Sequence, residues 1–171
     1  MIVKYSQIIH SPVIELKSQT QLGVATDLVI QKSDLAIKAV IVKNGLLNVN
    51  TKIATNADIV ELNSGSVIVR DDDSLVALSE AERIREAIKD KMYGINQRVR
   101  TKSGKSLGRV YDYTIDNATC AIQKFYVKSL LDDRIISVSS ITKFEGKNIT
   151  VKDDFELITA AGPAFTPEIA Q

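Results

Sequence analysis

The residues best suited to chemistry are five cations in the second half of the chain. They fall within twelve consecutive positions that contain no acidic residue: Arg98, Arg100, Lys102, Lys105 and Arg109. On a shared face, these side chains could bind RNA phosphates or an acidic patch on a protein. The corresponding stretch of the first half, residues 13–24, holds Glu15 and Lys17 and is balanced in charge. The five cations are therefore the candidate partner-binding residues.

A phosphate-binding loop is a second candidate, because Gly104-Lys105-Ser106 matches the end of that motif. The motif requires a glycine at position 99, where this chain has Val99. It also requires a helix next, whereas residues 107–111 have the character of a strand. The sequence therefore predicts a hairpin turn here and not a nucleotide site.

Asp27 and Asp112 occupy equivalent places in the two halves of the chain, each near the middle of an expected strand. As acids or metal ligands they would need companions, and no His, Cys or second carboxylate recurs at a matching spacing. A carboxylate inside a strand can instead accept hydrogen bonds from backbone amides at a β-bulge. We predict that structural role for both residues.

The remaining chemical candidates lack partners in the sequence. His10 is the only histidine, and no acid or nucleophile is positioned beside it. Cys120 has no nearby basic residue that would lower the pKa of its thiol. The acidic runs 71–73 and 153–154 lack the alternating ligands and central glycine of a calcium loop, so we interpret them as solvated strand ends. The sequence predicts no enzyme, no cofactor and no metal site.

An internal repeat supplies the elements that must position these residues. An offset of 85 positions places residues 14–30 on 99–115, with Leu22-Gly23 on Leu107-Gly108 and Asp27 on Asp112. After a three-residue deletion, an offset of 82 places Ile59 on Ile141 and continues to the end of the second copy. We interpret the chain as two copies of one domain.

Each copy has the pattern of short strands rich in Val and Ile, bounded by Asn, Gly, Ser and Asp. We expect strands at 24–30, 37–43, 58–62 and 66–70, and at 109–115, 121–128, 141–145 and 148–151. Hairpin turns are expected at 63–65 and 145–147, because glycine accepts the positive φ that such turns need. Strands this short favour a small antiparallel barrel in each copy.

A short helix is expected between the copies. Ser79 and Glu82 match a capping box, and Ala81, Ile84 and Ile88 form a narrow apolar stripe at helical spacing. We expect that stripe to lie against one barrel. The predicted organisation is a first barrel at 1–78, a linker helix at 79–92, a second barrel at 93–161 and a flexible tail at 162–171. The fold class is all-β, with two small barrels in tandem joined by a short α-helix.

The repeated residues resemble the pattern of the PRC-barrel family. In the first copy they are SPVIELKSQTQLGVATDLVI, AVIV and ADIVELNSGSVIV, and in the second VRTKSGKSLGRVYDYTID and IISVSSITKFEGKNITV. The resemblance covers residues 1 to about 160, although the proline that often precedes the Asp-Ile element is absent. It implies a PRC-type barrel in each copy. The family includes the photosynthetic reaction-centre H subunit and a ribosome-maturation factor, so the resemblance does not imply one function.

Composition limits the function classes further. The net charge of +1 provides no global attraction to nucleic acid, and 5% aromatic residues without Trp disfavour stacking on many bases. A single cysteine and no apolar stretch of membrane-spanning length predict a cytoplasmic protein without a transmembrane segment. We expect a non-catalytic interaction or scaffolding module with an unidentified protein partner. The alternative is a ribosome- or RNA-associated maturation factor, and the sequence also allows a homodimer.

Overall fold

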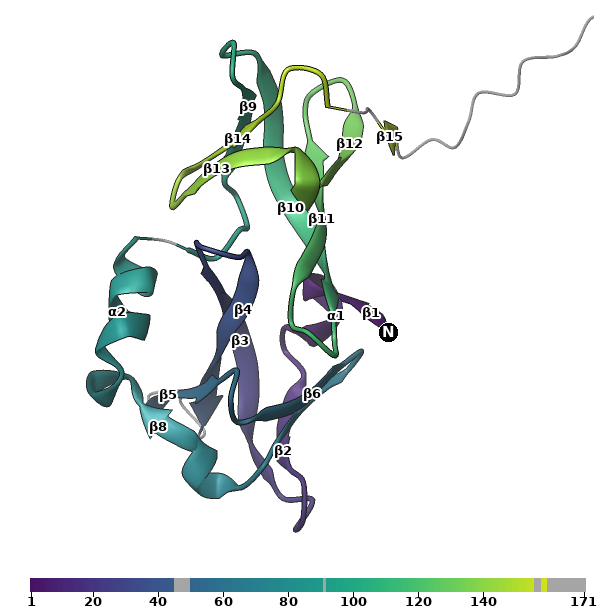
Figure 1. The fold of residues 1–171 in the computed structure, drawn as a ribbon. Coiled ribbons are helices and arrows are strands. Elements are labelled where there is room, and N and C mark those ends of the chain that lie inside the picture. The colour runs from purple at the N-terminus through teal and green to yellow at the C-terminus, as the bar shows by residue number, and fades with distance from the viewer. Residues whose placement is uncertain (45–49, 91, 156–157, 160–171) are drawn as a thin grey trace, which may run out of the picture.

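Two β-rich bodies follow one another along the molecule, with a helix beside the first of them (Figure 1). The computed structural model describes residues 1–44, 50–90, 92–155 and 158–159. The expected tail at 162–171 lies outside the described residues. Two sheets and a short helix confirm the prediction of a mostly β chain with two β bodies.

The first sheet contains seven strands in the order β6-β7-β2-β3-β4-β5-β8. Their bounds are Pro12–Glu15 (β2), Gln21–Gln31 (β3), Ala36–Asn44 (β4), Asn50–Thr55 (β5), Ile59–Asn63 (β6), Ser66–Val69 (β7) and Leu75–Ala77 (β8). The strands expected from Val- and Ile-rich runs are present, and β3 and β4 extend beyond the expected bounds. The sequence analysis did not identify β2, β5 or β8, which are short or less apolar.

The second sheet repeats the same order with equivalent strands, β13-β14-β9-β10-β11-β12-β15. Their bounds are Arg98–Thr101 (β9), Ser106–Asp116 (β10), Ile122–Lys128 (β11), Asp133–Ser137 (β12), Ile141–Glu145 (β13), Asn148–Val151 (β14) and Ile158–Thr159 (β15). An additional strand from the start of the chain, β1 (Ile2–Lys4), pairs with β10. Matching strand orders are the structural counterpart of the sequence repeat.

Strand pairing corrects two details of the sequence analysis. Each sheet contains one parallel pair, β2 with β7 and β9 with β14, so neither sheet is purely antiparallel. In addition, Val13 lies opposite Gly23 and Val99 lies opposite Gly108. Val13 therefore corresponds to Val99. The offset of 85 had placed Ile14 on Val99, so it is wrong by one position in this strand. The β2–β3 loop is one residue longer than the β9–β10 loop and absorbs the difference.

The linker helix α2 (Glu82–Lys89) lies on the first sheet, as its apolar stripe predicts. Ile84 is buried there against Val29, Ile41 and Ile53. The predicted capping box at Ser79 is wrong, because residues 78–80 form a 3₁₀ turn and the helix begins only at Glu82, without a side-chain cap. Two further 3₁₀ turns lie at Asp72–Ser74 and Val138–Ser140.

Equivalent residues of the two repeats meet at the contact between them. The backbone N–H of Ile37 donates to the carbonyl of Cys120 at 2.8 Å, and the N–H of Ile122 donates to the carbonyl of Leu35 at 2.9 Å. Leu35 and Cys120 both have positive φ, 52° and 58°. Because each repeat gives and receives the same bond, this contact has local two-fold character. We call the contact the seam.

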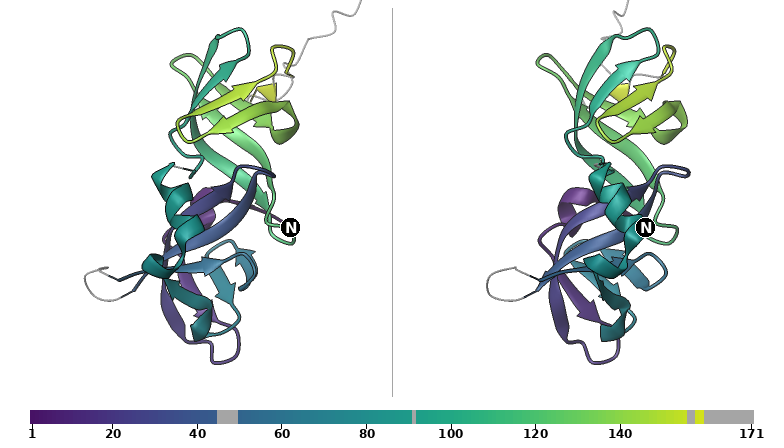
Figure 2. Two further views of the ribbon diagram at one scale, coloured as in Figure 1. Left: turned by 60° about the vertical axis from the view of Figure 1, so that its left-hand side comes forward. Right: turned by 90° about the vertical axis from the view of Figure 1, so that its left-hand side faces the viewer.

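The two repeats also share a core. The short helix α1 (Tyr5–Ile8) lies between the sheets (Figure 2), and one apolar cluster runs from Leu28 and Ile37 to Tyr113 and Phe125. The two repeats therefore do not have fully separate cores. The start of the chain packs on the second sheet through β1, and the N–H of Ile30 donates to the carbonyl of Met92 at 2.7 Å. The segment that precedes each repeat thus contacts the other repeat.

Both predicted hairpins are present, and their glycines have different roles. Gly65 has φ of +91°, as the turn chemistry predicts. Gly146 does not have positive φ; instead, a Cβ there would lie 1.4 Å from the carbonyl oxygen of Asp90, just beyond α2. Gly146 is therefore needed for the close approach of the linker to the β13–β14 turn.

Candidate functional site

A cationic groove lies on the outer face of the second sheet. Along β9 the side chains alternate, with Arg98 and Arg100 exposed and Val99 buried. Arg109 on β10 lies directly opposite Arg98, and its side chain is also exposed. A two-residue period places these cations on one face of the sheet. The predicted clustering of the basic stretch is therefore present for these three arginines.

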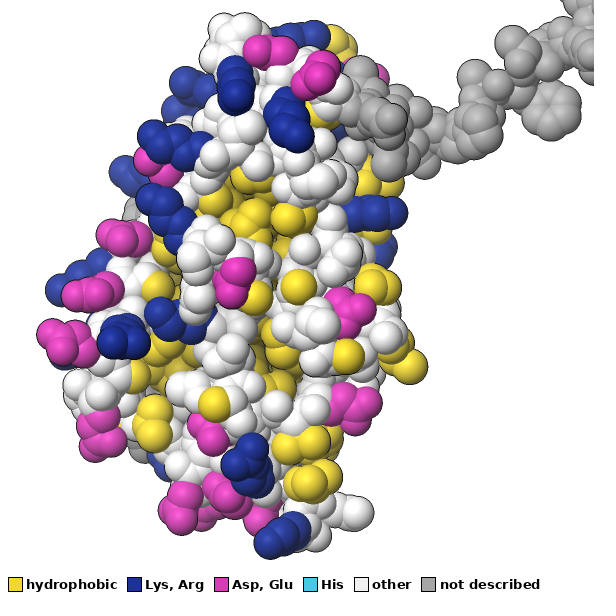
Figure 3. Space-filling view, viewed as in Figure 1, with side chains coloured by type: hydrophobic (Ala, Val, Ile, Leu, Met, Phe, Trp, Pro, Cys, Tyr) yellow, Lys and Arg dark blue, Asp and Glu magenta, His cyan; other side chains and the backbone are white. Residues whose placement is uncertain are grey.

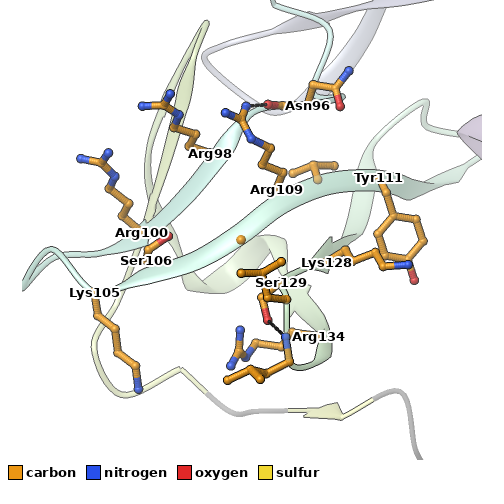
Figure 4. A pocket seen from close by; sticks show the side chains of 14 residues that line it. Asn96, Arg98, Arg100, Lys105, Ser106, Arg109, Tyr111, Lys128, Ser129 and Arg134 are labelled. Carbon is orange, nitrogen blue, oxygen red and sulfur yellow. Dashed lines mark hydrogen bonds between the residues drawn. The ribbon is translucent and has the colours of Figure 1, made fainter.

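The groove encloses about 1040 Å³, and Figure 4 shows its lining side chains. Arg98 and Arg100 project from β9, and Ser129 and Arg134 lie across β10 from them. Six cations line it, and none of the lining residues is acidic: Arg98, Arg100, Lys105, Arg109, Lys128 and Arg134. On the face drawn in Figure 3, Lys and Arg side chains gather along one edge of the upper body.

Most of these cations have no carboxylate partner. Within the described residues, ion pairs join only Arg134 to Asp132, at 3.2 Å, and Lys143 to Glu145. Arg109 donates to the carbonyl of Asn96 at 2.9 Å, which orients its guanidinium without neutralising it. Like charges directly opposite each other on a sheet are destabilising, so the pairing of Arg98 with Arg109 does not serve the fold.

Lys102 is the one predicted site residue that does not line the groove. It follows the end of β9. Hydrogen bonds from Ser103 lower the pKa of Asp153, and the charge of Lys102 adds a smaller contribution in the same direction. Ser103 donates to Asp153 through its N–H at 3.0 Å and its hydroxyl at 2.7 Å. Asp153 thus fastens the β9–β10 loop, which goes beyond the solvated strand end that the sequence suggested.

Sequence reasoning missed most of the other groove residues, among them Tyr111, Lys128, Leu130, Leu131 and Arg134. Lys128 lies opposite Arg109 in the register of β10 and β11. Arg134 lies opposite Val127 on β11, and it reaches back to donate to the carbonyl of Leu107 at 2.8 Å. Only the strand pairing brings Lys128 and Arg134 to the basic stretch, so residue spacing along the chain carried no signal for these two.

Asp27 and Asp112 have the predicted structural role. The ladder shifts register at each of them, and each carboxylate accepts the next backbone N–H, from Leu28 and Tyr113, at 2.9 Å. Both also hold α1. Asp27 accepts the hydroxyl of Tyr5 at 3.1 Å, and Asp112 accepts the N–H and the hydroxyl of Ser6 at 3.1 and 2.7 Å. Burial raises the pKa of Asp27.

The other chemical candidates have local structural roles. Gly104 (φ +93°) lies in the predicted β9–β10 turn, where its N–H donates to the carbonyl of Thr101, and a strand follows. Burial and the charge of Asp116 raise the pKa of the Cys120 thiol, so it is a weak nucleophile. His10 is an exposed residue with φ of 68°, and its N–H donates to the carbonyl of Ala25.

The described residues contain no group of three or more His, Cys, Asp or Glu side chains arranged to hold a metal ion. None of their helices combines the length and apolar character that a membrane crossing requires.

Comparison with known proteins assigns neither a family nor a function to this chain. No protein-family model matches the chain, and no curated protein matches it. The function is therefore argued from the geometry of the groove and from the comparison of the two repeats within this chain.

Proposed function

We propose that this protein is a non-catalytic interaction module that binds an anionic partner in the cationic groove of its second repeat. The observation that carries the proposal is a set of three exposed arginines, without carboxylate partners, at positions where the first repeat has uncharged residues. Pro12, Ile14 and Val24 occupy the sheet positions of Arg98, Arg100 and Arg109. The first repeat folds with neutral residues there, so the fold does not require the cations.

The lining of the groove supports binding over catalysis. Its hydroxyl groups come from Ser106, Ser129 and Tyr111, and no lining His, Asp, Glu or Cys could activate them. Arginine is suited to holding carboxylates or phosphates in a fixed geometry without itself changing protonation. The cations stand on paired strands, which supply a rigid base for recognition.

A PRC-barrel character of each repeat is part of the proposal. It is supported by the identical strand order of the two sheets and by the place of the repeated Leu-Gly-x-x-x-Asp pattern. In both copies, the glycine of that pattern lies opposite the preceding strand and the aspartate lies at a β-bulge. A barrel closed in each repeat would leave the groove on an outer wall.

An RNA-associated role is the second candidate. The specific observation that favours it is the unpaired Arg98–Arg100 face, since arginine also binds phosphate oxygens. Binding through phosphates would weaken steeply with added salt and would show little dependence on sequence.

Charge reversal in the groove tests the proposed function. Purified Arg98→Glu/Arg100→Glu protein would be compared with Lys17→Glu/Arg83→Glu protein, which carries the same change in net charge on exposed residues outside the groove. The probes are fluorescent poly-glutamate and oligouridylate, measured by anisotropy over a salt series. We expect the groove variant to lose most binding to at least one probe and the control to retain it. Equal binding by both variants, or no binding by the wild type, would refute the proposal.

A further inference from the structure

Two large aliphatic side chains stand fully in solvent beside the cations. Leu130 and Leu131 are 104% and 90% exposed, the highest values among the large apolar residues of the described chain. Both line the groove. Leucine side chains gain about 1.5–3 kcal/mol each when they are fully buried, so their exposure next to a binding groove indicates a contact surface.

The turn that carries these leucines is held in place. The N–H of Ser129 donates to the carbonyl of Asp132 at 3.0 Å, and the Ser129 hydroxyl accepts the N–H groups of Leu131 and Asp132 at 3.3 and 3.1 Å. Arg134 then connects the turn to the sheet, through Asp132 on one side and the carbonyl of Leu107 on the other. The leucines are therefore presented by an ordered turn.

The cations and the leucines flank β10 from opposite sides. In Figure 4, Arg98 and Arg100 lie on one side of this strand, and Ser129 and Arg134 lie on the other. Arg109 stands on β10 itself, between the two walls. A ligand lying along β10 would meet guanidinium groups on one wall and aliphatic surface on the other.

We propose that the groove binds an acidic protein segment that carries aliphatic side chains. This inference rests on the proposed function and specifies its partner. Carboxylates of the segment pair with Arg98, Arg100 and Arg109, and its apolar side chains pack on Leu130 and Leu131. Binding then combines a salt-sensitive contribution from the arginines with a salt-insensitive one from the leucines.

Nucleic acid fits the apolar wall less well. Tyr111 is the only aromatic residue among the lining residues, and its ring already lies 6.0 Å from that of Tyr126. Single-stranded RNA gains much of its binding energy by stacking bases on aromatic rings. Exposed leucines offer no such surface, and they contribute nothing to phosphate contacts.

An anionic membrane fits the groove less well for a different reason. Leu130 and Leu131 lie within the turn that the hydrogen bonds between Ser129 and Asp132 close, and Ser129 lies across β10 from Arg98 and Arg100. A narrow segment can enter between these walls, whereas a bilayer that received the leucines would not fill the hollow between the turn and β9.

The test uses the chain of residues 1–171 and two synthetic peptides of equal charge. One peptide has four Glu-Glu-Leu repeats and the other has four Glu-Glu-Ser repeats, and oligouridylate and vesicles of phosphatidylcholine with phosphatidylserine are the competing probes. We expect the leucine peptide to bind at least about tenfold more tightly than the serine peptide. The variant Leu130→Ser/Leu131→Ser should remove that difference, and its residues are exposed, so the fold should be retained.

The outcomes separate this inference from the proposed function. If both peptides bind equally and the arginine reversal abolishes both, the groove binds anions and the aliphatic specification is wrong. Tighter arginine-dependent binding of oligouridylate, or of vesicles, would also overturn the inference while the proposed function stands. If no probe binds in a manner that depends on Arg98 and Arg100, the proposed function fails as well.

Discussion

The same sheet face carries three arginines in the second repeat and uncharged residues at the three equivalent positions of the first. In the second repeat, Arg98 and Arg109 form a cross-strand pair, whereas the equivalent pair in the first repeat is Pro12 and Val24. Both sheets nevertheless have the same strand order. The comparison teaches that strand pairing and the buried face determine the scaffold, while the outer face is free to change. Arg98, Arg100 and Arg109 therefore lie at positions where the first repeat folds without a cation.

The largest expected effect is at the glycines that repeat in both copies. A Cβ on Gly108 would lie 2.2 Å from the carbonyl oxygen of Lys128, and φ is +122°. At Gly23 the nearest atoms would be 2.7 Å away, and φ is not in the left-handed region. We expect Gly108→Val to cost about 3 kcal/mol or more in the free energy of unfolding, and more than Gly23→Val. Urea titration followed by circular dichroism measures both.

The shared core adds an expectation about cooperativity. Two independent barrels would leave the first half folded in Gly108→Val protein, but the apolar cluster here is continuous from Leu28 to Phe125. We therefore expect amide protection in the first repeat to fall together with that in the second. Hydrogen exchange that left strands β3 and β4 fully protected would show that the halves are independent.

The second largest effect on stability is expected at the two carboxylates that lie at β-bulges, Asp27 and Asp112. Asp112 is 7% exposed and accepts three hydrogen bonds, two of them from Ser6, whereas Asp27 is only partly buried. Replacing Asp112 by alanine leaves the buried N–H of Tyr113 without this acceptor and releases Ser6, which costs about 1–3 kcal/mol. We expect Asp27→Ala to cost less. Thermal unfolding of the two variants measures both losses of stability. An equal or larger loss in the Asp27→Ala protein would contradict the assigned roles.

The third effect is a pH dependence that belongs to the first repeat. Burial raises the pKa of Asp27 above its ordinary value of 3.8, so the folded state disfavours the charged carboxylate. Protonated Asp27 therefore adds to the free energy of unfolding. This contribution is fully present below pH 3.8 and is lost as the pH rises through the raised pKa of Asp27. In Asp27→Asn protein the stability should fall less over that window. An unchanged pH profile would exclude Asp27 as its source.

The smallest effect is expected from exchanging the outer faces. Arg100→Ile/Arg109→Val protein carries the residues of the first repeat, and we expect its stability to change by no more than about 0.5 kcal/mol. Loss of the like-charge contact between Arg98 and Arg109 would, if anything, stabilise the sheet. Ile14→Arg/Val24→Arg protein is the reciprocal exchange. A large loss of stability in the first variant would mean that the fold does require its cations.

Sequence reasoning succeeded where the pattern was local. Runs of Val and Ile predicted strands β3, β4, β10 and β11, and the stripe through Ile84 predicted which side of α2 is buried. It failed where an element is too short to show a repeating pattern of buried and exposed residues. The segments β1 and α1 contain three and four residues, and their positions depend on contacts with residues more than a hundred positions away, such as that from Ser6 to Asp112.

The candidate site was predictable only along one strand pair. Arg98 and Arg100 were found because they belong to a run of cations without an acid, and the two-residue period of β9 places both on one face. Lys102 does not follow this pattern, because β9 ends at Thr101. Lys128 and Arg134 enter through the pairing of β11 with β10 and with β12. Gly146 was expected to serve turn conformation, but it is needed because the carbonyl of Asp90 approaches it closely.

The reciprocal bonds between Leu35, Ile37, Cys120 and Ile122 have a consequence for how this molecule could change over time. Because both halves lie on one chain, their association is intramolecular and behaves as if each were present at millimolar concentration. A contact too weak to hold two separate molecules together therefore suffices. The two halves can therefore differ in sequence and remain associated, so the outward side chains of one half can change while those of the other stay the same.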